Sequence, residues 1–277
     1  MQRLCEYLHL SRGAYYRWVK DPVSYSERYN QEISEKLKEI HEAHPDMGYR
    51  RLRDELDKNY GIAVNDKRIL RICRTEHIQS TIKWKPKSCT KNSDDPAHIA
   101  KNYLNRDFHA DAPNEKWLTD VTEFKYHTDD EVHKVYLSAI LDLYDRRIVA
   151  FRIGTHNDNA LVLNTFDDAV VHEPGAHPLF HSDRGFQYTS KMFSARLKNH
   201  HMRQSMSRRG RCLDNGPMEG FWGLLKREMY YGRRYTSRED LVTAIESYIG
   251  YYNTGRIQRK LHLMTPVEYH ENYYVAA

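Results

Sequence analysis

The sequence predicts an α/β fold in which a mixed sheet is covered by helices on both faces and is preceded by small all-α modules. Up to about residue 80, apolar residues recur at helical spacing. From Asn114 onward, three strand-like runs come first, and helical and strand-like segments then alternate. That order is typical of a sheet enclosed between two layers of helices.

The first 80 residues divide into two helical modules. Residues 1–29 form a short segment with two helices, and Ser11 is a good N-cap for the second of them. This segment is either a small helix-turn-helix or a plain helical hairpin. Residues 30–80 hold three longer helices. The five expected helices are Arg3–His9, Arg12–Val19, Gln31–Ala43, Tyr49–Tyr60 and a helix that runs from Asn65 or Asp66 to about Thr75.

The third helix of the second module is basic on the side away from its apolar face. That apolar face carries Ile69, Ile72 and Cys73. The basic residues on the other side are Lys67, Arg68, Arg71 and Arg74. Three helices with a basic last helix outline a helix-turn-helix DNA-binding module. The alternative is a three-helix bundle with a solvated face.

Two further basic stretches are candidate DNA contacts. Residues 81–112 lack clean periodicity and begin with Lys83 and Lys85, so we expect an exposed basic linker that tracks a phosphate backbone. The second stretch carries Arg208, Arg209, Arg211 and Lys226. The alternative for both stretches is a solvated charged face. The modest net charge of +5 does not decide between the two interpretations.

Residues 113–277 are expected to form the mixed-sheet domain and its C-terminal helices. The first three strands have short polar connections, which predicts an antiparallel meander. The expected strands are Lys116–Phe124, Val132–Leu143, Arg147–Ile153, His177–His181 and Gln204–Met206. The expected helices are Asn159–Val171, Ser190–His200, Pro217–Tyr230 and Arg238–Tyr252.

The composition excludes several classes of protein. The four cysteines lie far apart without a Cys-x-x-Cys pair, so neither a zinc ribbon nor a disulfide framework is expected. No apolar run approaches the roughly 20 residues that cross a membrane. The N-terminus lacks a signal-peptide pattern. The sequence therefore predicts a cytoplasmic protein without a membrane partner.

Three motifs each contribute one carboxylate in a strand, strand-end or helix-start context. They are Trp117-Leu-Thr-Asp120-Val-Thr-Glu-Phe124, His181-Ser-Asp183-Arg-Gly-Phe-Gln-Tyr188 and Asn215-Gly-Pro-Met-Glu219-Gly-Phe-Trp-Gly-Leu-Leu-Lys226. Asp is a poor strand residue, and a buried, unpaired Asp120 needs a partner or a metal. Taken singly, Asp183 is explained as a turn residue and Glu219 as an acid at a helix start.

Taken together, the three carboxylates favour a divalent-metal site. Mg²⁺ prefers hard oxygen ligands and often takes few carboxylates from the protein. Two such ions about 3.5–4 Å apart support an in-line attack on a phosphate. Lys226 follows Glu219 by almost two helical turns and lies on the same flank, where it suits a phosphate beside the metal.

At these residues the chain resembles the DDE transposases of bacterial insertion sequences, specifically the second reading frame of the IS-three family. Retroviral integrases are more distant relatives. The resemblance extends from the Tyr49-Arg-Arg-Leu segment through Asn65-Asp-Lys-Arg and the three carboxylate motifs. It ends with Tyr251-Tyr-Asn253 and Thr265-Pro266.

The resemblance implies an RNase H-like catalytic core in which Asp120, Asp183 and Glu219 are catalytic and bind Mg²⁺, for which Mn²⁺ can substitute. It places Lys226 near substrate DNA. It implies cutting and joining of DNA at insertion-sequence ends, that is, DNA recombination and integration. The expected partner is double-stranded DNA, comprising the element's terminal inverted repeats and target DNA. A homo-oligomer is expected because the reaction joins two DNA ends.

Two departures from relatives matter. The retroviral type carries a His/Cys zinc module, whereas His41 and His44 are followed by no Cys pair, so no zinc is expected. In the family, a frameshift commonly fuses an upstream frame with its own DNA-binding helices. An upstream-frame protein or fusion is therefore an expected partner.

Two alternative functions stay open on the sequence. An RNase H-like nuclease would cut DNA without joining it. A catalytically silent DNA-binding regulator of the element would need only the first half of the chain. Reading the carboxylates as mere surface acids requires three motifs to match by accident.

Overall fold

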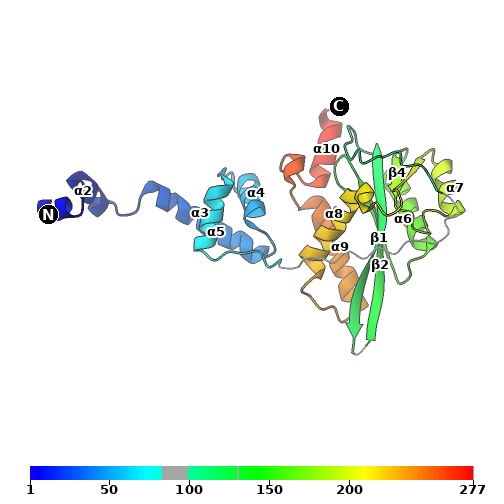
Figure 1. The fold of residues 1–277 in the computed structure, drawn as a ribbon, viewed down its shortest axis with the longest axis horizontal. Coiled ribbons are helices and arrows are strands. Elements are labelled where there is room, and N and C mark those ends of the chain that lie inside the picture. Colours follow the sequence, from blue (N-terminus) through cyan, green and yellow to red (C-terminus); the bar gives the residue numbers. More distant parts are fainter. Residues whose placement is uncertain (83–98, 130, 277) are drawn as a thin grey trace. The chain divides into compact units, whose positions relative to one another are not determined.

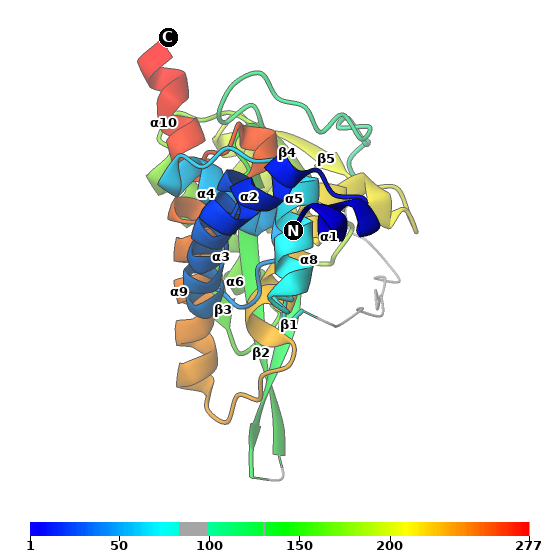
Figure 2. The same ribbon diagram turned by 90° about the vertical axis from the view of Figure 1, so that its left-hand side faces the viewer.

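The computed structural model describes residues 1–82, 99–129 and 131–276, which fall into two compact units, Met1–Lys83 and Trp84–Ala277 (Figures 1 and 2). Lys83 and Lys85, expected to contact DNA, lie outside the described residues. The division into domains at residues 29, 80 and 112 remains a prediction, although the first of these limits falls inside a helix.

The first unit is entirely helical in its described part. Its helices are α1 (Gln2–Tyr7), α2 (Arg12–Lys20), α3 (Tyr25–Ala43), α4 (Tyr49–Tyr60) and α5 (Asp66–Thr75). Helices α3 to α5 enclose a core that includes Leu37, Leu52 and Ile69, all fully buried. The predicted caps are present, because Ser11 accepts a hydrogen bond from the Ala14 amide and Asn65 from that of Arg68.

Helix α3 begins six residues earlier than the expected start at Gln31. The reason is a capping box, in which the Ser24 hydroxyl accepts from the Glu27 amide and the Glu27 carboxylate accepts from the Ser24 amide. The apolar pattern begins only at Ile33, so periodicity alone places the start too late.

The second unit holds a five-stranded mixed sheet, which confirms the predicted fold class. The strands are β1 (Lys116–Thr128), β2 (Glu131–Asp142), β3 (Ile148–Gly154), β4 (Leu179–Ser182) and β5 (Arg203–Met206). Their spatial order is β3-β2-β1-β4-β5. The first three form the predicted antiparallel meander, and β4 and β5 join parallel to β1.

Helices cover both faces of this sheet, as Figure 1 shows. Helices α6 (Asn159–His172) and α7 (Lys191–Asn199) pack on one face, where Phe166 of α6 meets Trp117 and Phe180 of the sheet. Helices α8 (Gly216–Leu225) and α9 (Arg238–Thr254) pack on the other face over Leu118 and Phe124. The remaining helical segments are η1 (Cys212–Asn215), the π-helical η2 (Lys226–Tyr230), η3 (Arg259–Leu261) and α10 (Pro266–Ala276).

The described residues 99–112 of the expected linker are mostly exposed, but two of them are anchored in the core of the second unit. Leu104 and Ala110 are buried in the core beneath α8 and α9. The Tyr103 and Leu104 amides both donate to the Ser205 hydroxyl, at 2.9 and 3.1 Å. Side-chain acceptors on β5 thus fix a segment that has no regular periodicity of its own.

Candidate active site

Asp120 and Asp183 both lie just beyond the residues through which the neighbouring parallel strands β1 and β4 pair. Strand β1 pairs with β4 from Lys116 to Leu118, and Asp120 follows two residues later. Asp183 directly follows Ser182, the last residue of β4. Ends of this kind are where α/β sheets place ligands.

The Asp120 carboxylate is held by two neutral donors on different oxygens. Its Oδ1 accepts from the Val121 amide at 2.8 Å, and its Oδ2 accepts from the Trp222 indole nitrogen Nε1 at 3.0 Å. Burial is the main cause that raises the pKa of Asp120, and the negative charges of Asp183 and Glu219 raise it further. The three carboxylates therefore share one electrostatic environment.

Asp183 stands in a turn where side chains pack closely against Gly185. Its Oδ1 accepts from the Gly185 amide at 2.8 Å. A Cβ atom on Gly185 would lie 3.0 Å from that oxygen and 3.1 Å from Oε1 of Gln187. Burial raises the pKa of Asp183 as well. The Asp-Arg-Gly sequence therefore holds the carboxylate tightly, beyond its ordinary role in a turn.

Glu219 lies in the first turn of α8 and is exposed. Partial burial nonetheless raises its pKa. No Lys or Arg in the described parts of the chain forms an ion pair with Asp120, Asp183 or Glu219. These carboxylates are therefore available to a cation.

The three carboxylates do not by themselves form a complete set of metal ligands. Within residues 1–82, 99–129 and 131–276, no three His, Cys, Asp or Glu side chains are gathered as a ready metal site. The donor chemistry nevertheless fits a hard divalent ion, because carboxylate oxygens without cationic partners are its preferred ligands. A cation would also relieve the repulsion that raises the pKa of Asp120.

Lys226 is the first residue after α8, and its proximity to the substrate remains a prediction. Its Nζ stands 5.1 Å from the centre of the Phe124 ring. Burial lowers the pKa of Lys226, and the charges of Asp120 and then Glu123 partly offset that effect. The Lys226 ammonium group is therefore within electrostatic range of Asp120 without forming an ion pair with it.

The other basic residues of the sequence prediction fall into two groups. Arg208 is bound through its guanidinium to Asp214, and Arg68 binds Asn30 and lies over the Tyr29 ring. The remaining five described residues are exposed. They are Lys67, Arg71, Arg74, Arg209 and Arg211.

Sequence reasoning missed two polar residues that build the surroundings of the site. Asp214, fully buried, accepts from Asn102, Arg106 and Arg208. His181, also fully buried, contacts the hydroxyls of Ser205 at 2.8 Å and Ser207 at 3.1 Å. The only available signal was the strand position of His181, two residues before Asp183.

Family models match most of the chain and define its class. Two models described as "Integrase core domain" match residues 110–212 and 219–273, and one described as "HTH-like domain" matches residues 28–86. Together with the mixed sheet, the integrase-core matches confirm the RNase H-like catalytic fold. The fold and site thus define a protein of the integrase-core class.

Individual relatives narrow the class to a family. "Putative transposase InsK for insertion sequence element IS150" of Escherichia coli (strain K12) is 35% identical over 277 residues, covering 99% of this chain and 95% of the relative. "Transposase InsF for insertion sequence IS3A" of the same organism is 29% identical, covering 90% and 86%. The chain therefore belongs to the IS-three family of bacterial insertion-sequence DDE transposases, which are enzymes of DNA transposition and integration.

A solved structure is also similar. The catalytic core domain of the integrase of HTLV-2, in complex with magnesium, aligns with 58% of this chain and 99% of its own, with a TM-score of 0.45 at 18% identity. Separately, none of the helices in the described residues combines the length and apolar character that a membrane span requires.

Proposed function

We propose that Asp120, Asp183 and Glu219 hold Mg²⁺, or Mn²⁺ in its place, and that the chain cuts and joins DNA strands at the ends of an insertion sequence. The observation that carries the proposal is that Asp120 on β1 and Asp183 just after the neighbouring strand β4 have no cationic partner among the described residues, while the charges of Asp183 and Glu219 raise the pKa of Asp120. Burial and mutual repulsion disfavour the charged carboxylates when no cation is bound. The site is therefore suited to divalent cations, and we infer two per site.

When bound, the ions would activate the attacking oxygen and stabilise the leaving oxygen of a phosphate. The chain's own residues set the geometry. Asp120 and Asp183 are fixed by hydrogen bonds from Val121, Trp222 and Gly185, and Lys226 supplies a positive charge for the phosphate. Water as nucleophile gives cutting, and a DNA 3′-hydroxyl in the same place gives joining.

Each unit carries exposed basic residues that we propose as DNA contacts. In the first unit, Lys67, Arg71 and Arg74 are exposed on α5, the last helix of a segment matched by an HTH-like model, and we propose that they contact the terminal inverted repeats of the element. In the second unit, we propose that the exposed Arg209 and Arg211 also contact DNA. A homo-oligomer on DNA, completed by an upstream-frame protein or fusion, fits a reaction that joins two ends. No zinc is part of the proposal.

A strand-transfer assay tests the proposal. It combines an oligonucleotide carrying the 3′ end of the parent element, a plasmid target and Mg²⁺ or Mn²⁺. Asp183→Asn should abolish joining while DNA binding persists. Asp168→Asn is the matched control, because Asp168 is an acid of the same domain that pairs with Arg152.

The outcomes separate the functions that the sequence left open. Joined product that disappears in Asp183→Asn but not in Asp168→Asn supports the transposase. Nicking without joining would favour a nuclease or a chain that requires an upstream partner. DNA binding without either reaction, under every metal tested, would replace the proposal with a DNA-binding regulator.

A further inference from the structure

Helix α8 and the residue that caps it contact strand β1 at Asp120 and at Thr119 beside it. Within α8, Glu219 and Trp222 are three residues apart, which places them on one side of the helix. Asn215 directly precedes α8 as its N-cap residue. Figures 1 and 2 both show α8 lying beside β1.

Trp222 reaches Asp120 directly. Its indole Nε1 donates to Oδ2 of Asp120 at 3.0 Å, while the Val121 amide donates to Oδ1 at 2.8 Å. Two donors on different oxygens fix the plane of the carboxylate and leave a lone pair on each oxygen. Trp222 is itself 7% exposed and packs in the core with Phe221 and Leu225. Its indole is therefore a rigid support.

Asn215 joins the same helix to β1 one residue earlier on the strand. Its Nδ2 donates to the Thr119 carbonyl at 3.2 Å, and the side chain is buried. Its Oδ1 has no hydrogen-bond partner among the described residues. The amide must keep its nitrogen toward Thr119, because an oxygen there would face another oxygen.

The two contacts bracket Glu219. Asn215 lies about one turn before it and Trp222 about one turn after it, and both bind β1 at adjacent residues, Thr119 and Asp120. A slip of the helix along the strand would break both hydrogen bonds. The position of Glu219 relative to Asp120 is thereby fixed, although Glu219 itself makes no hydrogen bond to β1 among the described residues.

We propose that Trp222 and Asn215 are positioning residues, which hold α8 in register with β1 so that Glu219 and Asp120 bind the same cation site. This inference rests on the proposed function. Partners that orient metal-binding residues typically contribute about 10–100-fold to metal affinity or activity. The plain alternative is that each side chain only satisfies a buried polar group.

The decisive variant is Trp222→Phe, with Trp117→Phe as its control. Both variants keep an aromatic ring and lose an indole N–H that donates to a carboxylate. In Trp117 that carboxylate belongs to Asp142, at 3.2 Å and outside the candidate site. Asn215→Ala is the second variant, and its control is Asn253→Ala, which removes an amide bound to the Ile148 backbone.

Two readouts are compared across the four variants and the unaltered full chain. One is the metal concentration for half-maximal DNA cutting, and the other is the rise in melting temperature on adding Mn²⁺ without DNA. We expect Trp222→Phe and Asn215→Ala to need about 10-fold more metal, with cutting restored at high metal, while the controls stay within about twofold of the unaltered protein.

Trp222→Phe that matches Trp117→Phe in both readouts would overturn the positioning role. An unaltered protein that binds Mn²⁺ but cuts no DNA would overturn the proposed function, while the melting readout would still decide the role of Trp222 and Asn215. An unaltered protein that neither binds Mn²⁺ nor cuts DNA would overturn both.

Discussion

The catalytic unit contains two kinds of buried carboxylate, and they differ in their donors. Asp214 is fully buried and accepts from Asn102, Arg106 and Arg208, and the Arg208 contacts are the main cause that holds its pKa far below the usual range. Asp120 accepts only from an amide and an indole. The first carboxylate is neutralised within the fold, and the second is not.

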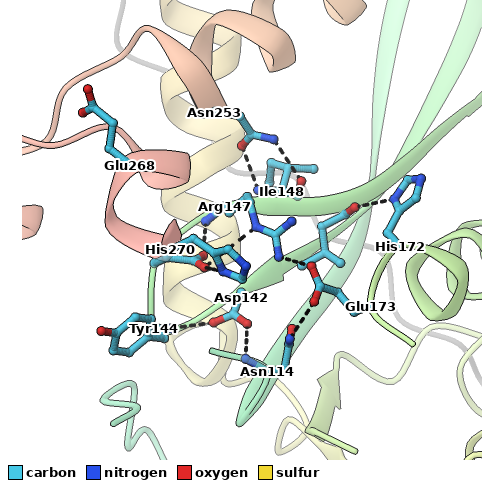
Figure 3. Close-up of polar contacts among 12 residues, drawn as sticks. Asn114, Asp142, Tyr144, Arg147, Ile148, His172, Glu173, Asn253, Glu268 and His270 are labelled. Atoms are coloured by element: carbon cyan, nitrogen blue, oxygen red, sulfur yellow. Dashed lines mark hydrogen bonds and ion pairs between the residues drawn. The ribbon is translucent and has the colours of Figure 1, made fainter. Parts of the chain in front are cut away.

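A second set of buried carboxylates with several hydrogen-bond partners lies around the turn between β2 and β3, as Figure 3 shows. Asp142 accepts from the Asn114 and Tyr144 amides, and Asp145 contacts the His270 ring at 2.7 Å. Burial, and then the charge of Asp145, raise the pKa of Asp142 to about 7. The direction of a pKa shift therefore does not by itself separate a carboxylate of the candidate site from one inside a hydrogen-bonded network elsewhere in the fold.

The largest expected effect tests the carboxylates that lack cationic partners. Glu219→Gln removes a proposed metal ligand and should reduce strand transfer by roughly 10³-fold or more, equivalent to about 4 kcal/mol of barrier. DNA binding should persist. Glu246→Gln, at an exposed acid on α9, is the control. Equal activity of the two variants would remove Glu219 from the site.

The next effect tests Asp214, the buried carboxylate that accepts hydrogen bonds from two arginines. Asp214→Asn leaves Arg106 and Arg208 without their carboxylate, and we expect the free energy of unfolding to fall by about 3 kcal/mol. Because the folded pKa of Asp214 is lowered, its contribution is present above its ordinary pKa and disappears only in strong acid.

Urea unfolding between pH 5 and 8, compared with the unaltered chain, measures the Asp214 contribution. A stability difference that shrinks steadily toward pH 5 would contradict the lowered pKa.

The third effect concerns His181, which the fold keeps neutral. Burial lowers the pKa of His181 to about 4. Below about pH 6.5 the His181 imidazole binds a proton in the unfolded chain but not in the folded chain. The free energy of unfolding therefore falls as the pH drops from about 6.5 toward 4, by up to about 3 kcal/mol.

His181→Asn should be less stable at pH 7 but should lose this slope, whereas His156→Asn, at an exposed site, should keep it. Unfolding by denaturant across this pH range provides the measurement, and an unchanged slope in His181→Asn would refute the assignment.

The smallest effect runs in the stabilising direction. Burial raises the pKa of Asp183, so its charge costs stability in the metal-free protein, and this cost grows as the pH rises above the ordinary value. Asp183→Asn keeps the acceptor for Gly185 and should melt about 2–4 °C higher in the presence of a chelator. With Mn²⁺ the order should reverse. A chelated variant that melts lower would place Asp183 with the structural carboxylates.

The sequence predicted those features that depend on local chemistry. N-caps at Ser11 and Asn65 lie where the residue types favour them. The strand-end position of Asp183 and the helix-start position of Glu219 were also readable from the apolar runs beside them.

Features that depend on distant partners escaped prediction. Arg208 looked like a free cation because its partner, Asp214, is identifiable only once the loop between them is folded. Strand β1 runs four residues past its expected end because β2 pairs with it up to Thr128, and that stretch lacks apolar alternation. Helix α10 was not delimited in advance, since its pattern mixes Tyr, His and acidic residues.

The order of the strands in the sheet also determines at which stage of folding the candidate active site forms. Strands β1, β2 and β3 are consecutive in the chain and pair through short connections, so the meander can form early in folding. Strand β4 joins β1 only after a helix has intervened, and α8 follows later still. Closing such long loops is slow. We therefore expect Asp120 to be in place on the meander of a growing or partly folded chain before Asp183 and Glu219 are positioned beside it. The capacity to cut DNA would then arise only after β4 and α8 have joined the meander.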